Sequence, residues 1–393
     1  MKNVTLTLIV LVLAVGFSIN NVEAQSSSNV VTTAVPFLRI SPDARAGAMA
    51  DAGIATSSDA YNAYWNIAKT AFSSSTSNIG LTYTPWLQDL GLNDVYMVNA
   101  AGFYKLDDQQ AITGSLRYFS LGSIQQTDQS GNSQGKFRPQ EFAIDGGYSR
   151  KLSDRLGIGV GLRFISSNLA TGVAVSNAPT AQTGTAVAGD IHIFHTHLND
   201  KGEGLNYGIT LSNLGSKISY YKDASNKNYI PATLAVGAAY TKVYDIDNKV
   251  TFVGELSKLL VPVDTATTDA SITEYNSKGV IGSWFSSFSA PGGELKQIDI
   301  SGGAEYSYQD QFFLRAGYFY ENASAGGRQF FTAGAGLKYN TFTLNFSYLV
   351  PSGNGITRSP LSNTLRFSLI FDLDKNAAGT TDKASPAATP TDQ

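Results

Sequence analysis

The sequence contains no cysteine, only three histidines, and few charged residues, which make up 15% of its 393 positions. No disulfide can therefore contribute to its stability. The net charge of −3 is nearly balanced, and lysine and arginine form no long block, so nucleic acid is not an expected partner. Beyond residue 24 there is no uninterrupted apolar stretch of about 18 residues, which excludes a transmembrane helix there.

The first residues have the pattern of a cleaved secretory signal. Lys2 is followed by an uncharged apolar run from Val4 to Phe17 and then by Val22-Glu23-Ala24, with small residues at the positions that precede a cleavage site. The apolar run is shorter than the about 20 residues that a membrane-spanning helix needs. We therefore expect residues 1–24 to be a signal peptide.

Glycine and aromatic residues are abundant, with 38 Gly, 20 Tyr and 21 Phe, and they occur in segments with a period of two. Between residues 157 and 164 one face carries only apolar side chains and the other carries glycine and one arginine: Ile158, Val160, Leu162 and Phe164 oppose Gly157, Gly159, Gly161 and Arg163. Such alternation indicates a β-strand with one apolar face. Strands of this composition are typical of membrane β-barrels with aromatic girdles.

The chain contains fourteen such segments. They lie at 78–84, 95–105, 109–120, 138–151, 155–168, 185–198, 204–214, 230–243, 249–260, 295–308, 311–321, 327–339, 341–350 and 362–373. Connections after even-numbered segments are short, and those after odd-numbered segments are mostly long. Bacterial barrels have an even strand number, short periplasmic turns and longer outer loops. We therefore predict an all-β fold, a 14-stranded antiparallel transmembrane β-barrel of the outer membrane over residues 78–374, with both termini periplasmic.

Two regions lie outside the predicted barrel. Residues 25–77 are rich in small side chains and are predicted to form a plug or hatch inside the lumen, with a periplasmic linker as the alternative. The glycines of the strand at 157–164 would leave room for such a plug. Residues 375–393 are rich in Ala, Thr, Pro and Asp and are expected to be a disordered periplasmic tail.

No group of residues has a pattern that predicts catalysis. His195 and His197 share one strand face and His192 the other, so the three cannot readily bind one metal ion. The sequence 131–135 matches a nucleophile motif by letter but has no following helix. The paired aspartates at 107–108 and 245–247 lack a full calcium ligand series. We expect no enzyme activity, no cofactor and no metal.

Two long connections are unusually apolar, which often marks contact with a partner. The residues predicted to make this contact are Trp86, Leu87, Leu90, Leu92, Trp284, Phe285 and Phe288. The alternative is that these side chains belong to the aromatic belt in the membrane lipid or fold back over the mouth of the barrel.

Several segments resemble the PorV/PorQ group, relatives of the FadL transporter family. The resemblance rests on residues 43–56 and 64–68, and it continues through 83–87, 116–122 and 137–142. Its N-terminal motif is carried here by Arg45, Gly47, Asp51, Gly53, Trp65 and Asn66. The chain departs from many FadL relatives at 66–68, where Asn-Ile-Ala replaces Asn-Pro-Ala, which weakens the case for fatty-acid transport.

The resemblance implies a fourteen-stranded barrel with an N-terminal hatch and a role in type IX secretion. Members of this group bind the C-terminal signal domain of cargo, pair with a large translocon barrel (SprA or Sov) and pass cargo to an attachment complex with the sortase PorU. The alternative is a FadL-like transporter of fatty acids or other hydrophobic molecules. The inward Phe119, Phe313 and Phe319 would then line an apolar pocket, although they could equally pack against the plug.

Overall fold

The structure is a computed structural model, which describes residues 30–88, 91–127, 130–169, 181–221, 227–264, 268, 271, 274–275, 277–289, 294–351 and 363–374. The predicted signal peptide and C-terminal tail lie outside these residues, as do Leu90 and residues 25–29.

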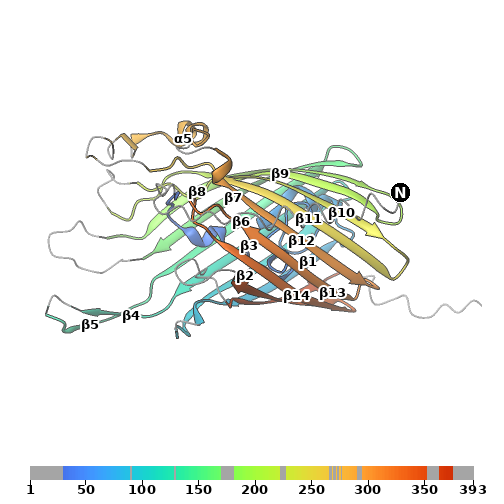
Figure 1. Cartoon of the computed structure of the whole chain (residues 1–393), viewed down its shortest axis with the longest axis horizontal. Coiled ribbons are helices and arrows are strands. Elements are labelled where there is room, and N and C mark those ends of the chain that lie inside the picture. The colour runs from blue at the N-terminus through green and yellow to red at the C-terminus, as the bar shows by residue number, and fades with distance from the viewer. Residues whose placement is uncertain are drawn as a thin grey trace, which may run out of the picture.

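Fourteen antiparallel strands form a closed barrel (Figure 1). They are β1 (Ser77–Pro85), β2 (Val95–Lys105), β3 (Gln110–Leu121), β6 (Gln140–Lys151), β7 (Leu156–Asn168), β8 (Gly184–Leu198), β9 (Gly204–Gly215), β10 (Thr233–Val243), β11 (Asn248–Leu259), β12 (Ile298–Tyr308), β13 (Phe312–Tyr320), β14 (Gln329–Tyr339), β15 (Phe342–Pro351) and β16 (Leu365–Asp372). The ring closes where β1 pairs with β16, with Ile79 opposite Phe371. The predicted fourteen-stranded fold is confirmed.

Strand boundaries follow the predicted segments to within three residues, and two of the largest differences have a clear physical reason. β10 begins at Thr233 rather than at 230, because Pro231 in the preceding segment has no N–H for a strand ladder. β12 begins at Ile298 rather than at 295, because the short helix η4 (Glu294–Gln297) precedes it.

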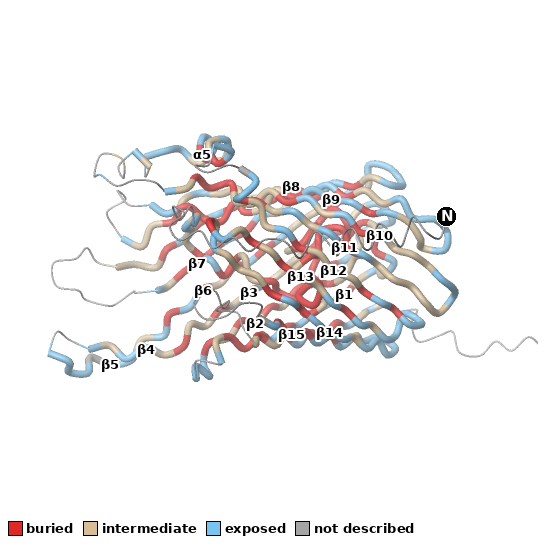
Figure 2. The backbone as a smooth tube through the Cα atoms, viewed as in Figure 1, coloured by how far each residue is buried: buried red, intermediate tan, exposed pale blue. Residues whose placement is uncertain are grey.

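The outer surface of the wall is apolar, as the period of two predicted. Buried and exposed positions alternate along each strand (Figure 2). Leu162, for example, is 71% exposed. Neighbouring strands also present adjacent aromatic rings outward: the centroids of Tyr83 and Tyr96 are 5.8 Å apart, and those of Phe142 and Phe164 are 6.2 Å apart. This surface suits the hydrocarbon of a bilayer and its interface.

Long connections gather at one end of the barrel and short turns at the other (Figure 1). Between β3 and β6 the chain forms a two-stranded sheet of β4 (Ile124–Thr127) and β5 (Ser133–Phe137), which the sequence did not predict. The connection after β11 carries helix α5 (Val280–Ser286). We call these two ends the long-loop end and the short-turn end.

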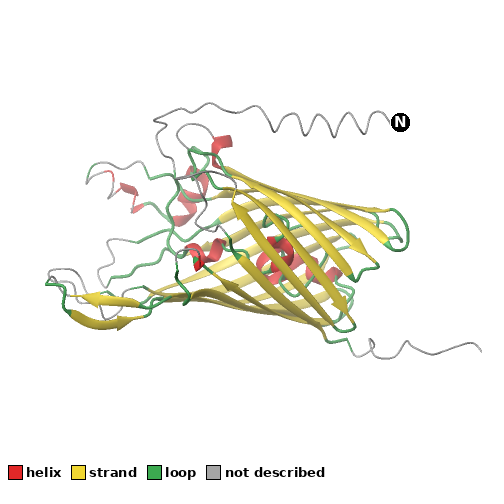
Figure 3. Cartoon of the chain, turned by 60° about the horizontal axis from the view of Figure 1, so that its bottom comes forward, coloured by secondary structure: helices red, strands yellow, loops and turns green. Residues whose placement is uncertain are grey.

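The remaining helices precede the barrel in sequence and are short: η1 (Pro36–Arg39), α2 (Ala44–Gly47), α3 (Asn62–Trp65) and η2 (Ile67–Phe72). Across the described part of the chain, no helix is both long and apolar enough to span a membrane. The helices from α2 to η2 lie within the ring of strands (Figure 3). We call residues 35–72 the N-terminal segment.

The N-terminal segment runs through the lumen from one end of the barrel to the other. At the long-loop end the Ala34 N–H donates to the Tyr229 carbonyl, 2.9 Å away. At the short-turn end the Thr76 N–H donates to Asp374, 2.6 Å away. The first described residues therefore lie at the opposite end from Asp374. Residues 1–29 and 375–393 lie outside the described residues, so the periplasmic placement of both termini stays a prediction.

Candidate functional site

Arg45 connects the N-terminal segment to the barrel wall. Its guanidinium donates two hydrogen bonds of 3.0 Å to Glu305 on β12 and one of 3.2 Å to Asp59 of the segment itself. Glu305 also accepts a 2.6 Å hydrogen bond from Arg315 on β13. The buried carboxylate is thus paired with two arginines, which buried charges require.

Asp43 and Trp65 organise the turn at the centre of the segment. One carboxylate oxygen of Asp43 accepts from the Ala46 N–H at 2.9 Å and caps α2, and the other accepts from the Trp65 indole at 2.6 Å. Burial raises the pKa of Asp43 to about 6. A side chain at Gly53 would overlap the Trp65 ring, so only glycine fits there.

The other residues of the predicted N-terminal motif also contact the wall. Asn66 caps η2 through the Ala68 N–H, and its amide donates to the Ile193 carbonyl of β8 at 3.1 Å. Asp51 lies 3.6 Å from Arg366 of β16. A side chain at Gly47 would meet the same arginine at 2.6 Å. The structure therefore brings the six motif residues into one interface between the segment and the wall.

The glycine face of β7 receives helix η2. A Cβ atom at Gly159 would lie 2.6 Å from the Ala68 nitrogen, and one at Gly157 would lie 2.6 Å from the Phe72 ring. On the opposite wall a Cβ at Gly317 would lie 2.5 Å from the Met49 carbonyl carbon. At these positions the absence of a side chain is what allows the two backbones to approach.

A second ionic network lines the wall from β3 to β9. Arg163 is hydrogen-bonded to Asp145 and Asn213, and its guanidinium lies 2.9 Å from Asp190. Arg117 approaches Asp145 at 3.5 Å and stands 5.0 Å from the centre of the Tyr64 ring. All these wall charges are buried and paired.

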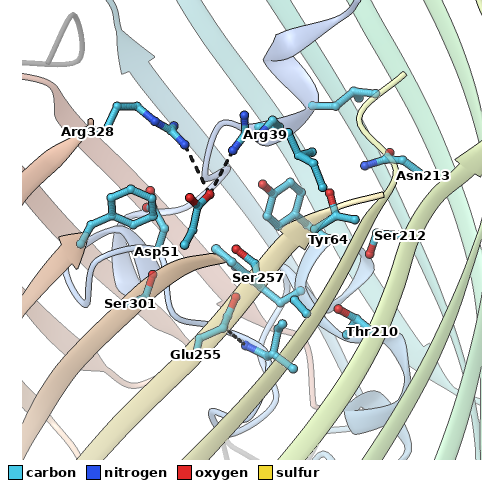
Figure 4. A pocket seen from close by; sticks show the side chains of 18 of the residues that line it. Arg39, Asp51, Tyr64, Thr210, Ser212, Asn213, Glu255, Ser257, Ser301 and Arg328 are labelled. Atoms are coloured by element: carbon cyan, nitrogen blue, oxygen red, sulfur yellow. Dashed lines mark hydrogen bonds and ion pairs between the residues drawn. The ribbon is translucent and has the colours of Figure 1, made fainter. Parts of the chain in front are cut away.

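A cavity of about 130 Å³ lies between the N-terminal segment and the wall (Figure 4). We call it the chamber. Arg39 and Arg328 stand on one side of it and Glu255 stands across from them. Tyr64 and Trp65 contribute aromatic rings, and Ser257 and Ser301 contribute hydroxyl groups from the wall. A carboxyl oxygen of Glu255 accepts hydrogen bonds from the N–H groups of Gly53 at 3.1 Å and Ile54 at 3.2 Å, which joins β11 to the segment.

Sequence reasoning missed the chamber, because its lining residues come from the N-terminal segment and from strands far apart in the chain. The only signal for it was a set of polar inward positions on β9, β11 and β12. These positions predict a polar lumen, but they do not show where the segment leaves space.

The predicted contact residues of the first long loop differ in how far their side chains are exposed. Trp86 is 8% exposed and packs edge-on against Phe119, with ring centroids 6.0 Å apart. Leu87 is half-buried against the same cluster. Only Leu92, at 41% exposed, reaches the surface. The Trp86 side chain is thus unavailable on the outside, since it closes the mouth over Phe37 of the segment.

The inward aromatic residues pack against the same segment. The rings of Phe119 and Phe37 are stacked at 6.4 Å, and Phe319 is stacked on Phe330 at 4.8 Å in a cluster with Ala50. Phe313 instead lies beneath Arg315, whose guanidinium is 5.0 Å from the ring centre.

Helix α5 presents apolar side chains to the outside at the long-loop end. Phe285 is 74% exposed and Phe288 is 47% exposed, while Trp284 is half-buried. The buried Ser283 hydroxyl is 2.6 Å from the Tyr229 hydroxyl, which fixes the helix to the connection before β10. Ile281 and Leu295 extend the exposed apolar surface, at 65% and 84%. We call Ile281, Phe285, Phe288 and Leu295 the α5 surface.

The histidines are arranged as predicted. His192 is buried and faces inward, whereas His195 is stacked on Tyr207 at 4.6 Å on the outer face. Within the described ranges no group of three or more His, Asp or Glu residues is placed to hold a metal ion. The turn aspartates Asp107 and Asp245 accept hydrogen bonds from backbone N–H groups of their own turns.

Solved structures with a similar fold include a hydrocarbon channel and a toluene transporter. A TodX variant described as a monoaromatic hydrocarbon channel matches with a TM-score of 0.50 and 12% identity, covering 84% of this chain and 97% of that chain. The P. putida toluene transporter TodX gives the same TM-score, identity and coverage of this chain, with 98% of its own chain covered. A Pseudomonas aeruginosa FadL homologue also matches, at 11% identity and a TM-score of 0.44, over 87% and 99% of the two chains. No curated protein matches the sequence.

The closed ring and its apolar outer face define a transmembrane β-barrel, and its fold is similar to that of the TodX channel. A family model described as "Type IX secretion system protein PorV" matches residues 23–266. The chain belongs to the PorV family of outer-membrane proteins of the type IX secretion system.

Proposed function

We propose that this protein binds the C-terminal signal domain of secreted cargo, pairs with the translocon barrel and delivers cargo to the cell-surface attachment complex. Its role is recognition without covalent chemistry. The short-turn end and the C-terminal tail face the periplasm, and the long-loop end faces outward. Family membership supports the assignment to type IX secretion. The observation that carries the choice of contact surface is the exposed apolar face of α5.

The α5 surface suits protein contact because it is apolar, exposed and anchored. Ile281 and Phe285 are each more than half exposed, and they stand on helix α5, which the Ser283–Tyr229 hydrogen bond holds in place. Leu295, 84% exposed, lies on the following helix η4. Clusters of exposed apolar side chains usually mark interaction sites. Aromatic residues are also enriched among those that dominate binding energy. A preformed surface loses less conformational entropy when it binds.

Transport of a hydrophobic molecule is the alternative function, and the lumen argues against it. The N-terminal segment fills the ring, and Phe119 and Phe319 pack within its aromatic clusters. The chamber is lined largely by hydroxyl and charged groups. Placing an apolar ligand against such groups would leave them without hydrogen bonds.

The proposal is tested by purifying a tagged protein from its own outer membrane in mild detergent and identifying associated proteins and lipids by mass spectrometry. A second, very large barrel or secreted proteins with a shared C-terminal domain would support the proposal. The substitution Phe285→Asp should reduce their recovery strongly, because a buried apolar contact would receive an unpaired charge. Ile246→Asp is the matched control, since Ile246 is 92% exposed at the short-turn end. A lone barrel that carries stoichiometric fatty acid would refute the proposal.

A further inference from the structure

The chamber contains polar groups that the protein itself leaves without partners. Thr210 and Ser301 are 3% and 7% exposed, and both line the cavity. Within the described part of the chain, their hydroxyls and those of Tyr64 and Ser257 make no hydrogen bond. Buried polar groups in folded proteins nearly always have a partner. These hydroxyls open onto the chamber, so a polar molecule inside it would supply the partners that the protein does not.

Glu255 adds a further acceptor to the same space. One of its oxygens is occupied by the Gly53 and Ile54 N–H groups, and the other has no hydrogen bond among the described residues. Hydroxyl groups both donate and accept, so a molecule with several hydroxyls would match the serine, threonine and tyrosine side chains as well as this carboxyl oxygen.

The arginines that line the chamber are already paired, which disfavours an anionic occupant. Arg39 and Arg328 lie 3.1 and 3.5 Å from Asp299, and Arg328 also lies 2.8 Å from Glu321. On the far side Arg163 is bonded to aspartates of the wall. An anionic ligand would have to break these pairs, at a cost that a neutral ligand avoids.

The size of the chamber limits the occupant to a small molecule. Its volume of about 130 Å³ is close to that of an engineered protein cavity of roughly 150 Å³ that holds benzene, which has six heavy atoms. A three- or four-carbon polyol has a similar size. A disaccharide is too large to enter.

Arg39, Asp299 and Arg328 stand between the chamber and the outside. These three residues also line a second cavity, of about 290 Å³, together with Val30 and Glu321 near the long-loop end. The two cavities are thus separated by side chains that are held by ion pairs and not by backbone. The side chains of Arg39 and Arg328 are 29% and 28% exposed, so they can move into solvent when the pairs open.

We propose that the chamber is a binding site for a small neutral polyol, which enters from the long-loop end past the Arg39–Asp299–Arg328 ion pairs. The occupant supplies hydrogen bonds to Tyr64, Thr210, Ser257, Ser301 and Glu255, and it stabilises the contact between the N-terminal segment and the wall. This inference is independent of the proposed role in secretion.

The absence of cysteine makes a direct test possible. A Ser257→Cys variant of the full-length protein in detergent is treated with a small thiol-specific methanethiosulfonate, and the labelling rate is followed by mass spectrometry. Ser153→Cys, in an exposed turn at the other end, is the control for reagent reactivity. Erythritol should slow the labelling of Ser257→Cys by about tenfold, equivalent to about 1.4 kcal/mol, and leave Ser153→Cys unchanged. Sucrose at the same osmolality should change neither rate.

The entry route is tested by adding Asp299→Asn to the Ser257→Cys variant. Opening the ion pairs should raise the labelling rate several-fold. Labelling of Ser153→Cys in the same background should stay constant and controls for reagent reactivity, and an unchanged β-sheet circular dichroism spectrum reports that the barrel is folded. Equal slowing by sucrose and erythritol would overturn the proposal, as would protection by ethanolamine but not by erythritol, which would show a cation site. Complete absence of labelling with and without Asp299→Asn would show a sealed cavity and would also overturn it.

Discussion

Arg45 and Glu305 are 260 positions apart in the sequence and are joined by two hydrogen bonds of 3.0 Å across the interface between the N-terminal segment and β12. Glu305 is shared with Arg315, so a single carboxylate pairs with two arginines, and Asp59 is a second partner of Arg45. This pairing makes the interface sensitive to one substitution.

Glu305→Gln should loosen the N-terminal segment without opening the barrel. Removing one partner of a buried ion pair leaves the other charge uncompensated, and we expect the free energy that holds the segment in place to fall by about 3 kcal/mol. Hydrogen exchange of the amides of residues 43–60 measures this change. Glu203→Gln is the control, because Glu203 pairs with Lys242 on the exposed surface and should have little effect. Unchanged protection in Glu305→Gln would contradict the prediction.

Gly159→Ala should displace helix η2. The added methyl group would lie 2.6 Å from the Ala68 nitrogen and 2.9 Å from the Ile67 carbonyl carbon, both in the backbone, so the helix must shift. We expect destabilisation of about 1–3 kcal/mol, visible as faster exchange of the amides in η2. Gly146→Ala on β6 is the matched control, since an added Cβ there meets nothing within 4 Å. Equal behaviour of the two variants would argue that the segment does not pack on β7 as described.

Val30→Cys should react from the same side of the membrane as the long loops. Val30 is 44% exposed and lies at the long-loop end, because the segment crosses the lumen. In intact cells a membrane-impermeant maleimide should label Val30→Cys and Ile281→Cys alike. Ile246→Cys, at the short-turn end, should react only after the outer membrane is permeabilised. If Val30→Cys followed Ile246→Cys instead, the chain could not run through the barrel in the direction described.

The stability of the segment should increase between about pH 8 and pH 10.5. Lys69 is buried and donates to the Gly53 carbonyl at 2.7 Å, and burial lowers its pKa to about 8. Between these pH values the unfolded state binds more protons than the folded state, so stability increases as pH rises. A shift from 10.5 to about 8 corresponds to about 3 kcal/mol.

Hydrogen exchange of residues 62–72, corrected for its intrinsic pH dependence, measures this increase. Lys69→Met should abolish it, and Lys201→Met, in an exposed turn, should retain it. A constant opening free energy over this range in the unmodified protein would show that Lys69 is not buried as described.

The strands were predictable because a barrel wall has a lipid side and a lumen side. Each residue of β7 faces either the lipid or the lumen. Large apolar residues therefore alternate with small or polar residues along its sequence, with a period of two. The sheet of β4 and β5 was missed for the converse reason. Its strands project beyond the barrel, and most of their side chains are exposed. Their sequences therefore lack the alternating apolar face that predicts a strand.

The contacts inside the lumen could be predicted only in part. The glycines of β7 indicated space for a plug, and the motif around Arg45 and Trp65 indicated which segment is involved. The pairing of Arg45 with Glu305 was not predictable, because nothing local distinguishes Glu305 from other inward polar residues. Trp86 shows the same limit: an apolar loop residue can face a partner or its own barrel, and only the position of Phe37 decides between them.

The last strand in the sequence, β16, is hydrogen-bonded to helix α2, which lies near the beginning of the described chain. The Ser368 hydroxyl on β16 accepts from the Ala44 N–H at 2.8 Å and lies 2.7 Å from the Thr82 hydroxyl of β1. Because α2 also packs on β14 and β15, its docking surface is complete only when β16 has joined the barrel. Truncated or stalled chains would keep this region uncovered, which leaves them open to proteolysis. Closure of the barrel by β16 thus completes the surface that protects the N-terminal segment.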